Sequence, residues 1–397
     1  MMSDASSRLS SDIDLFTDAA LEDPFPHYRA LRDIGPAAYL ERHEVWFLGR
    51  YTQVREALAD WQVYSSAHGV GLNPVINAAW ANALICVDPP AHTQMRKLIT
   101  ERLGPRHLKV VEDTIDHRAN ALVEQLVSAG SFDAVADLAQ DLPINVVMDL
   151  VGWPEDVRPH LLDMAAGGFD ACGPDGPRMQ ASLSKLGAMM ALITEVYDGG
   201  ALTPGGFGST IAEAAHQGEI SRDTAIGMLA GYVVAAFDTT INAIASGVWL
   251  FASNPDQWAR LRQEPGLVNR AANEIIRLES PIQLFSRVTT RDAALEDDVV
   301  IPAGARVVVC YGSANRDERR FDQPDRFDLG RSEIDQLGFG FGVHGCAGQS
   351  LARLEIHAVF RALARRAGAF ELDGPPERAL NNVTRGFARL PVRAVAA

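Results

Sequence analysis

The chain has 397 residues and a formal net charge of −15, from 36 Lys and Arg against 51 Asp and Glu. This acidic balance disfavours nucleic acid and anionic membranes as partners. No run of about 18 apolar residues is present, and the N-terminal segment lacks the basic patch and apolar core of a secretory signal. We therefore expect a cytoplasmic protein without a membrane span.

Nothing in the sequence divides the chain into parts. Length alone favours two or three domains, yet no long Gly/Ser linker, charge block or repeat occurs, and the Pro/Gly-rich patches at 173–174 and 204–206 are short enough to be loops. We interpret residues 1–397 as a single domain and a monomer, with about the first 15 residues disordered.

Most of the chain has apolar residues at three- and four-residue spacing, which predicts helices. The clearest predicted helices cover residues 51–60, 92–103, 108–129, 144–151, 179–197, 222–252, 271–279 and 350–366. The β-like runs are short, at 37–40, 45–48, 299–301, 306–309 and, weakly, 390–392. The fold class is therefore mainly α with small β-sheets.

The predicted helix over 222–252 differs from the others. Residues 225–237 contain no charge, and Asp238, Thr239 and Thr240 follow directly. Such a stretch is buried nearly all round, where an acid and two hydroxyls need a reason to be. Either the helix is a core helix that reaches the surface at Asp238, or these polar groups belong to a buried site.

Four cysteines, Cys86, Cys172, Cys310 and Cys346, lie far apart without a CxxC pair. This spacing argues against a disulfide framework, a zinc site and an iron–sulfur cluster, and leaves a single thiolate ligand possible. Cys346 lies in the most informative window, Phe-Gly-Phe-Gly-Val-His-Gly-Cys-Ala-Gly at 339–348. Its glycines let backbone N–H groups approach the sulfur, and the helix that follows presents its positive end. A thiolate held this way suits an iron porphyrin; the alternative is a turn around an inert buried cysteine.

This window resembles the haem-binding signature of the cytochrome P450 family, Phe-Gly-x-Gly-x-His-x-Cys-x-Gly, at every defined position. Weaker family elements occur in the family's order over nearly the whole chain. The resemblance implies a cytochrome P450 fold with a long central helix over haem b, Cys346 as the axial thiolate, and a monooxygenase that uses O2. It also implies that His92, Arg96, Arg287 and His344 bind the haem propionates.

Two further elements take roles from the same resemblance. Glu274 and Arg277 match the family's Glu-x-x-Arg, and Arg326 would complete a structural Glu–Arg–Arg triad. Residues 235–240 resemble the oxygen-activation segment, in which Thr239 bonds back to the preceding turn and Asp238 with Thr239 delivers protons. Ala236 stands where the family usually has glycine, which leaves the shape of the oxygen groove open.

Without a flavin or iron–sulfur motif, electrons must come from a separate protein. The best candidate is a small acidic [2Fe–2S] ferredoxin with an NAD(P)H-dependent reductase. It would dock on basic residues at the cysteine side of the haem. The candidates are Lys97, Arg102, Arg106 and Arg353.

Within the family, the C-terminal third is most similar to bacterial enzymes that O-demethylate methoxybenzoates. The substrate pocket expected from this similarity is mostly apolar, and its residues are His68, Val70, Leu72, Phe169, Cys172, Ala235, Leu284, Phe285 and Phe387. His68, Ala230 and Gly231 stand where that subgroup holds its carboxylate with cations, and a buried carboxylate without a cation is costly. We therefore expect O-demethylation of a small neutral methoxy-aromatic, such as a methoxyphenol.

Three alternatives remain open at this point. The first is hydroxylation of another small apolar molecule or a natural product. The second is a peroxygenase that uses hydrogen peroxide directly, and the third is a haem sensor or gas carrier without turnover. The Asp238–Thr239 pair argues against the last two, because neither a carrier nor a peroxygenase needs this proton delivery.

Overall fold

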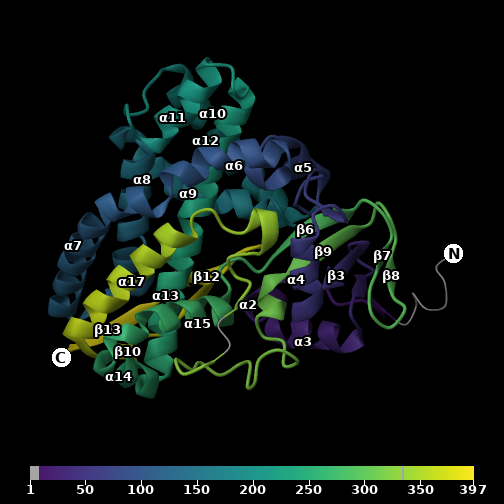
Figure 1. The fold of residues 1–397 in the computed structure, drawn as a ribbon. Coiled ribbons are helices and arrows are strands. Elements are labelled where there is room, and N and C mark those ends of the chain that lie inside the picture. The colour runs from purple at the N-terminus through teal and green to yellow at the C-terminus, as the bar shows by residue number, and fades with distance from the viewer. Residues whose placement is uncertain (1–8, 333–334) are drawn as a thin grey trace.

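The computed structural model describes residues 9–332 and 335–397 (Figure 1). The α-helices are α2 (Asp18–Glu22), α3 (Phe25–Ile34), α4 (Tyr51–Ala59), α5 (Pro74–Ala79), α6 (Ala91–Arg102), α7 (Pro105–Ala129), α8 (Asp141–Val151), α9 (Arg158–Asp170), α10 (Pro177–Asp198), α11 (Phe207–His216), α12 (Arg222–Ala236), α13 (Asp238–Ser253), α14 (Pro255–Gln263), α15 (Val268–Glu279), α16 (Tyr311–Ala314) and α17 (Gln349–Arg366). Shorter helical segments are η1 (Leu84–Cys86), η2 (Ala134–Ala139), η3 (Glu155–Val157), η4 (Pro265–Leu267) and η5 (Gly342–His344).

The strands are β1 (Ser10–Ser11), β2 (Ala38–Leu40), β3 (Val45–Leu48), β4 (Tyr64–Ser65), β5 (Ser131–Asp133), β6 (Leu284–Thr289), β7 (Ala293–Ala294), β8 (Val300–Ile301), β9 (Arg306–Cys310), β10 (Ala367–Leu372), β11 (Glu377–Leu380), β12 (Arg385–Arg389) and β13 (Pro391–Ala396). In the described part of the chain, six of them form the sheet β1-β2-β3-β9-β6-β4. The others form β10-β13-β5 and the pairs β11-β12 and β7-β8. Every predicted helix and strand is present, so the mainly α fold class with small sheets is confirmed.

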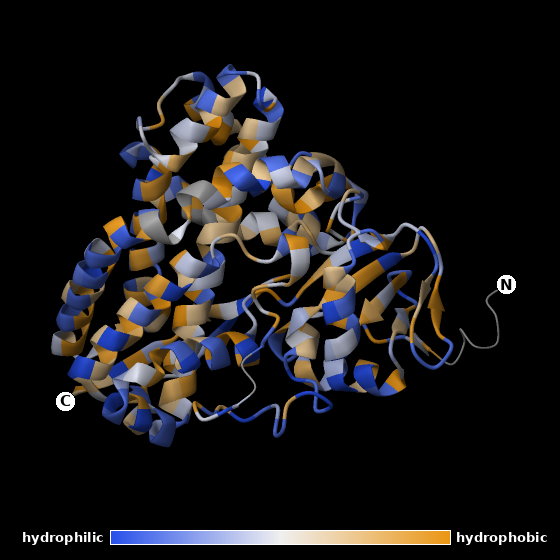
Figure 2. Cartoon of the chain, in the orientation of Figure 1, coloured by the Kyte–Doolittle hydropathy of each residue, from blue (hydrophilic) through white to orange (hydrophobic). Residues whose placement is uncertain are grey.

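The large sheet and the main group of helices occupy different sides of the molecule. In Figure 1 the large sheet and α3 and α4 lie on one side, and the remaining helices gather around α13. Figure 2 shows hydrophilic residues along outer helices such as α7 and hydrophobic residues on the strands of the large sheet. The core is continuous between the two sides, since fully buried Leu48 of β3 and Ile244 of α13 belong to one hydrophobic cluster.

The expectation of a disordered start fails for residues 9–15. Ser10–Ser11 pairs in parallel with Tyr39 and Leu40 of β2, and the side chain of Leu15 is buried. Backbone pairing and one apolar anchor are enough to fix a short terminal segment. Residues 1–8 lie outside the described residues.

The predicted helix over 222–252 is present but broken. α12 ends at Ala236 and α13 begins at Asp238, with Phe237 between them at φ −90° and ψ −72°. By length and composition alone, α12 and α13 together could cross a membrane. The search of the sequence for runs of about 18 apolar residues did not single out this stretch. Ile244, Ala245 and Val248 are fully buried inside the protein. A core helix satisfies the same test, and this burial is that of a core helix.

Candidate active site

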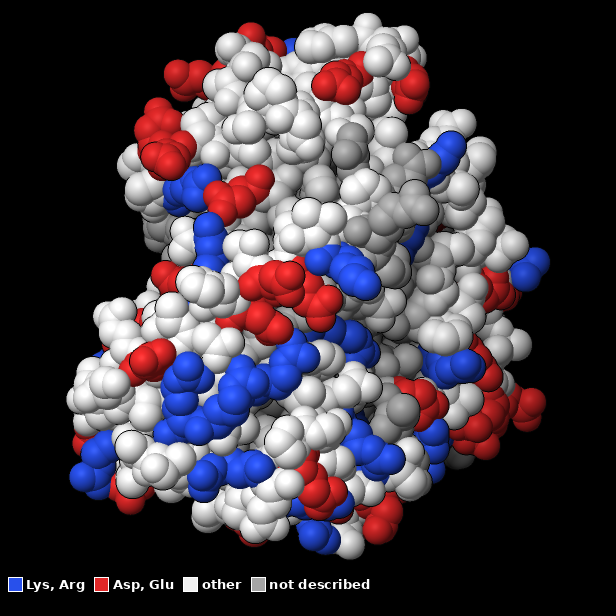
Figure 3. Space-filling model, turned by 60° about the vertical axis from the view of Figure 1, so that its left-hand side comes forward, with Lys and Arg blue, Asp and Glu red and all other residues white. Residues whose placement is uncertain are grey.

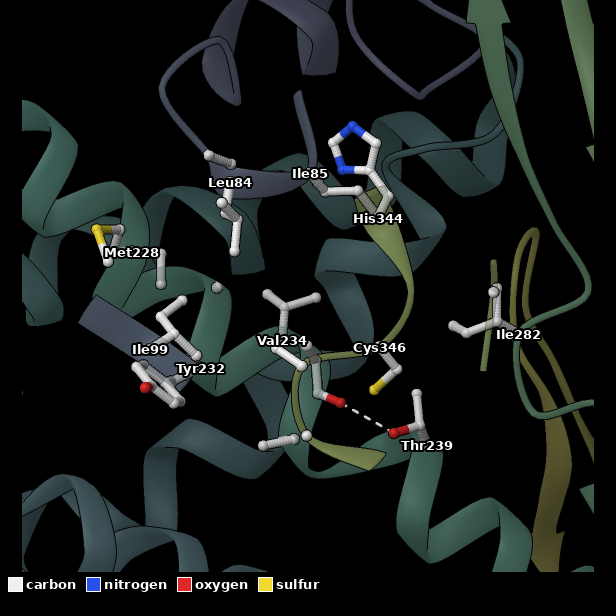
Figure 4. A pocket seen from close by; sticks show the side chains of 18 of the residues that line it. Leu84, Ile85, Ile99, Met228, Tyr232, Val234, Thr239, Ile282, His344 and Cys346 are labelled. Atoms are coloured by element: carbon white, nitrogen blue, oxygen red, sulfur yellow. Dashed lines mark hydrogen bonds between the residues drawn. The ribbon is translucent and has the colours of Figure 1, made fainter. Parts of the chain in front are cut away.

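A large cavity lies at the middle of the molecule, with a volume of about 600 Å³. Its walls come from α6, α12, α13, β6, the loop at 338–348 and α17. Of the four cysteines only Cys346 lines it, and Figure 4 shows its sulfur close to Thr239. The cavity therefore brings the cysteine loop and the oxygen-activation segment, about 100 residues apart in the sequence, to one place.

The cysteine loop is held by its own backbone. The Cys346 N–H donates to the Phe339 carbonyl at 2.7 Å, and Gly340 and Gly342 adopt φ values of 70° and 69°. A side chain at Gly342 would also meet the Leu58 carbonyl at 2.3 Å. Positive φ and this close approach both require glycine. The loop thus fixes the sulfur at the N-terminus of α17.

The surroundings of the Cys346 sulfur favour a thiolate once a cation is present. Burial raises the pKa of the Cys346 thiol, and the backbone N–H groups of Gly348 and Gln349 with the guanidinium groups of Arg96 and Arg353 act against that rise. Two N–H groups at a helix start and two nearby cations are the environment that stabilises a sulfur anion. An iron ion at the sulfur would complete it.

Besides Arg222, four cationic or potentially cationic side chains line the same cavity. The rings of His92 and His344 lie 4.5 Å apart between centroids, and the Nε2 atom of each is buried without a hydrogen-bond partner. Arg96 Nη2 donates to the Gly345 carbonyl at 2.5 Å, and Arg287 Nη1 donates to the Ser286 carbonyl at 2.8 Å. Burial lowers the pKa of His92 to about 4.

Buried nitrogens without partners indicate a missing acceptor. The two propionate carboxylates of a haem would supply this acceptor. They would accept hydrogen bonds from His92, His344, Arg96 and Arg287. The residues present therefore fit a haem: Cys346 would hold its iron, and these four side chains would bind its propionates.

The acid–alcohol pair lies at the break between α12 and α13. Thr239 Oγ1 donates to the Ala235 carbonyl at 2.9 Å, the bond drawn in Figure 4. A hydroxyl that donates a hydrogen bond to a carbonyl oxygen of the preceding turn bends the helix at that point. The break forms with alanine at position 236, which itself lines the cavity. The usual glycine is therefore not needed for this bend.

Asp238 stands beside Thr239 but does not line the cavity. Burial raises the pKa of Asp238 to about 7, and the nearby Asp170 carboxylate adds to the rise. Burial likewise raises the pKa of Asp170 to about 6. A carboxyl that titrates near neutrality can both bind and release a proton at about pH 7.

The sequence comparisons agree with this geometry. The family model described as Cytochrome P450 matches residues 209–394. A cytochrome P450 of Rhodopseudomonas palustris, CYP199A2, is 38% identical over 96% of this chain and 93% of its own length. The chain belongs to the cytochrome P450 family. The beta-dihydromenaquinone-9 omega-hydroxylase of Mycobacterium tuberculosis is 32% identical over 96% of this P450 and 78% of its own length.

Solved structures show the same fold. The crystal structure of CYP109E1 from Bacillus megaterium in complex with testosterone superposes with a TM-score of 0.86 at 24% identity, covering 96% of this P450 and all of that chain. As a family member, this P450 is a monooxygenase that binds haem through a cysteine thiolate. It needs O2 and an electron-transfer partner.

The structural triad forms, but with a different second arginine. Arg277 Nε and Nη2 each lie 2.8 Å from the Glu274 carboxylate, and both side chains are buried. Arg326 is exposed and contributes only its backbone carbonyl, which accepts from Arg277 Nη2 at 3.3 Å. Arg331 instead reaches Glu274, with Nε 3.1 Å from Oε1. The assignment of Arg326 was therefore wrong: its side chain points to solvent, and the chain returns to Glu274 five residues later.

Three of the expected pocket residues line the cavity, namely Phe169, Ala235 and Phe285. Ala230 and Gly231, which stand where a carboxylate-binding subgroup has cations, also line it. His68 does not: its side chain is exposed, and its carbonyl accepts from Arg306 Nη2 at 3.1 Å. These positions thus place small apolar residues, and no cation, on the cavity wall of α12.

The remaining expected pocket residues are buried elsewhere. Leu284 precedes Phe285 on β6, and alternation turns it to the other face of the sheet. The Cys172 thiol donates to the Gly168 carbonyl at 3.6 Å, and the Phe387 ring packs 5.7 Å from Trp249. Val70 and Leu72 do not line the cavity either: each makes backbone bonds that hold the loop in place, Val70 to Ser286 and Leu72 to Cys172.

Other cavity residues had no sequence signal strong enough to single them out. They are mainly apolar residues of α6, η1 and α12, including Leu84, Ile85, Ile99, Met228, Tyr232 and Val234. Glu355 of α17 also lines the cavity, and its Oε1 is buried without a partner. Burial raises the pKa of Glu355 to about 8, so this acid is neutral at pH 7. The sequence did contain one signal for Glu355: it is a polar residue one turn after Leu351, on the inward face of the predicted helix.

The expected docking residues are only partly described. Lys97 of α6 is exposed. Arg353 is half-buried, and its guanidinium lies 4.8 Å from the Phe339 ring centroid. This side chain therefore packs on the cysteine loop and is only partly available to a docking partner. The side chains of Arg102 and Arg106 lie outside the described residues. Figure 3 shows a band of basic side chains on the side that carries α7 and α17, although the net charge is −15.

Proposed function

We propose that this P450 O-demethylates a neutral methoxy-aromatic. The observation that carries the proposal is the charge distribution on the cavity wall. Among the described lining residues the arginines are Arg96, Arg287 and Arg222. The first two lie at the expected propionate edge, and Arg222 is paired with Asp198. A substrate carboxylate would therefore be buried without a cation, at a cost on the order of several kcal/mol of binding free energy.

The aromatic part of the proposal rests on the two phenylalanines of the wall. The Phe169 and Phe285 rings lie 6.5 Å apart between centroids at an interplanar angle of 40°. Edges and faces of two such rings favour a third planar ring beside them. Ala235 and Gly231 on the facing helix leave room for it.

The residues then have the following roles. When bound, the haem supplies the oxidation chemistry: a methoxy-aromatic, O2, two electrons and two protons give a phenol, formaldehyde and water. Cys346 would hold the iron, Arg96 and Arg287 would neutralise the propionates, and His92 and His344 would donate hydrogen bonds to them. Asp238 takes each proton, and Thr239 passes it into the cavity. Phe169 and Phe285 hold the ring so that its methoxy group lies toward Cys346.

We further propose that the electron donor is a small acidic [2Fe–2S] ferredoxin reduced by an NAD(P)H-dependent reductase. Docking near α6 would place its cluster on the Cys346 side, where Lys97 is exposed. We also propose a cytoplasmic location, because the reductase of this partner would draw on the NAD(P)H of the cytoplasm.

A titration of the ferric protein tests the substrate class. We expect a methoxyphenol to shift the Soret band to the blue, which reports loss of water from the iron, and the matching methoxybenzoate to have at least about tenfold weaker affinity because its charge is uncompensated. Optical titration at constant ionic strength gives both dissociation constants. Tighter binding of the acid would contradict the charge argument, and a lack of response to both would contradict the aryl-ether assignment.

Replacing Thr239 by alanine should uncouple electron use from product. The hydroxyl that delivers protons and holds the helix break is then lost, so we expect product per NAD(P)H to fall about tenfold or more and hydrogen peroxide to rise. Both are measured in the reconstituted system. Thr210→Ala is the matched control, because Thr210 Oγ1 makes the same kind of bond to the Gly206 carbonyl on α11, away from the cavity. Unchanged coupling in Thr239→Ala would exclude the relay.

Turnover should depend on pH through Asp238. With a pKa of about 7, its carboxyl donates protons below that pH and is a carboxylate above it. We therefore expect product formation to decrease as the pH rises through 7. In Asp238→Asn the rate should be lower by about 10² and this limb should vanish, because an amide does not titrate. A limb at the same pH in the variant would assign the titration to another group.

A further inference from the structure

The cavity does not end above Cys346. Its lining continues along α12 to Arg222 and Asp223, 17 and 16 positions before Thr239. At 1.5 Å per residue this is roughly 25 Å of helix. We call the part lined by residues 222–234 of α12 the side arm. In Figure 4, Met228, Ile99 and Tyr232 lie on the other side of Val234 from Cys346 and Thr239.

The walls of the side arm are apolar. Besides α12, they come from α6, α8, α10 and α11, through Ile99, Leu103, Val147, Val151, Met190 and Phe207. The Thr194 hydroxyl also lines it but already donates to the Met190 carbonyl at 2.7 Å. Such a surface gains by contact with hydrocarbon and offers few hydrogen bonds to water.

Gly231 marks open space in the arm. A Cβ added there would meet no heavy atom within 4 Å, whereas at Gly227 it would lie 3.3 Å from the Asn82 carbonyl oxygen. α12 therefore touches the segment before η1 at Gly227 and stands free of it one turn later. A larger side chain at position 231 would project into the passage between the arm and the space above Cys346.

The far end of the arm is electrically balanced. Arg222 Nε and Nη2 donate to the two carboxylate oxygens of Asp198 at 3.1 and 2.7 Å, and Arg222 Nη1 lies 3.6 Å from Asp223. These three side chains are half or more exposed, so the far end of the arm lies at the protein surface, and there Arg222 already has two carboxylate partners. The group that fits is uncharged.

We propose that the side arm binds an unbranched apolar tail of the substrate, so that the molecule oxidised at Cys346 is an arene with a neutral hydrocarbon chain. The inference rests on the proposed function and extends it, since the small methoxy-bearing ring occupies only the part near Phe169 and Phe285. From Ala235 to Arg222 the arm follows 13 positions, or about 20 Å. An extended hydrocarbon chain covers roughly 1.2 Å per bond, so this length accommodates a tail of up to about sixteen carbons, and a decyl tail stays within the arm.

The test is a series of Soret titrations with 4-alkylanisoles whose alkyl group grows from methyl to decyl. Each added methylene that enters the arm should tighten binding by about two- to fourfold, until the arm is filled. A parallel series of plain n-alkylbenzenes separates the two proposals. If only the methoxy assignment is wrong, the alkylbenzenes still show the chain-length dependence. If affinity does not change with chain length in either series, the side-arm proposal is overturned.

Gly231→Leu locates the effect. Its side chain would block the passage, so the dependence of affinity on chain length should be lost beyond the shortest members. The matched control is Gly187→Leu on α10, which is exposed, has open space around it and lies outside the cavity. It should keep the wild-type dependence. Haem content and the spectrum of the reduced CO complex verify the fold of both variants. An unchanged dependence in folded Gly231→Leu overturns the proposal.

Discussion

Cys346→Ser is expected to eliminate monooxygenase activity, by at least about 10³-fold, while the chain still folds. Serine keeps the backbone bond from position 346 to Phe339 and fits the space of the thiol, but it cannot supply the thiolate that promotes O–O cleavage. The reduced CO complex should lose the red-shifted Soret band of thiolate-ligated haem. Turnover with a reconstituted electron-transfer system and the CO difference spectrum measure both effects.

Cys172→Ser is the matched control. Cys172 is buried, whereas Cys346 is partly buried at the cavity wall; the Cys172 thiol bonds to the Gly168 carbonyl, and it does not line the cavity. We expect normal haem ligation and turnover within about threefold of wild type, because a hydroxyl can make the same bond. A CO spectrum typical of thiolate ligation in Cys346→Ser would instead assign the ligand to another cysteine.

Glu274→Gln should lower the free energy of unfolding by about 3–5 kcal/mol, the range expected when one member of a buried ion pair is removed. Arg277 would remain as a buried charge, since its other partners in the described chain are carbonyls such as those of Asn315 and Pro324. Glu274 also accepts from the Asp328 N–H and from Arg331. Chemical denaturation of the haem-loaded protein measures the loss.

Two arginine variants separate the triad members. Arg331→Ala should also destabilise, because its guanidinium is nearly buried against Glu274. Arg326→Ala removes only an exposed side chain and should change the free energy of unfolding by less than about 0.5 kcal/mol. Equal losses in the two variants would contradict the assignment of Arg331 to the triad.

Much of the fold follows from local pattern. Helical spacing placed α7, α10 and α17 within a few residues, and β3 at its observed bounds, because apolar periodicity reflects burial directly. The predicted helix of 222–252 is continuous, although a back-bond of Thr239 that bends the helix was expected from the resemblance to the family. The pattern of apolar residues continues across the bend, so only the hydrogen bond of one hydroxyl marks it.

The site divides in the same way. Residues tied to a short motif, such as Cys346, His344 and Thr239, come together as expected, because the local backbone fixes where they point. Residues placed by similarity over loops do not: Leu284 turns to the far side of β6, and Phe387 packs on Trp249. One residue of register decides which face a strand side chain occupies. Distant sequence similarity does not fix the register to within one residue. For the same reason, Arg326 was assigned to the triad in place of Arg331.

The helix break divides the central element into halves with different freedom to change. Beyond its cavity residues Thr239, Thr240 and Ala243, α13 is mostly buried, so a substitution there disturbs the core; Ile244 and Val248 are fully buried. α12 has one face on open cavity, where Gly231 has room for a larger residue. Replacements on α12 can therefore alter which molecules bind without loss of folding, while Thr239 keeps its position at the start of α13. An ancestor with this arrangement could acquire new substrates by single mutations and keep its proton delivery intact.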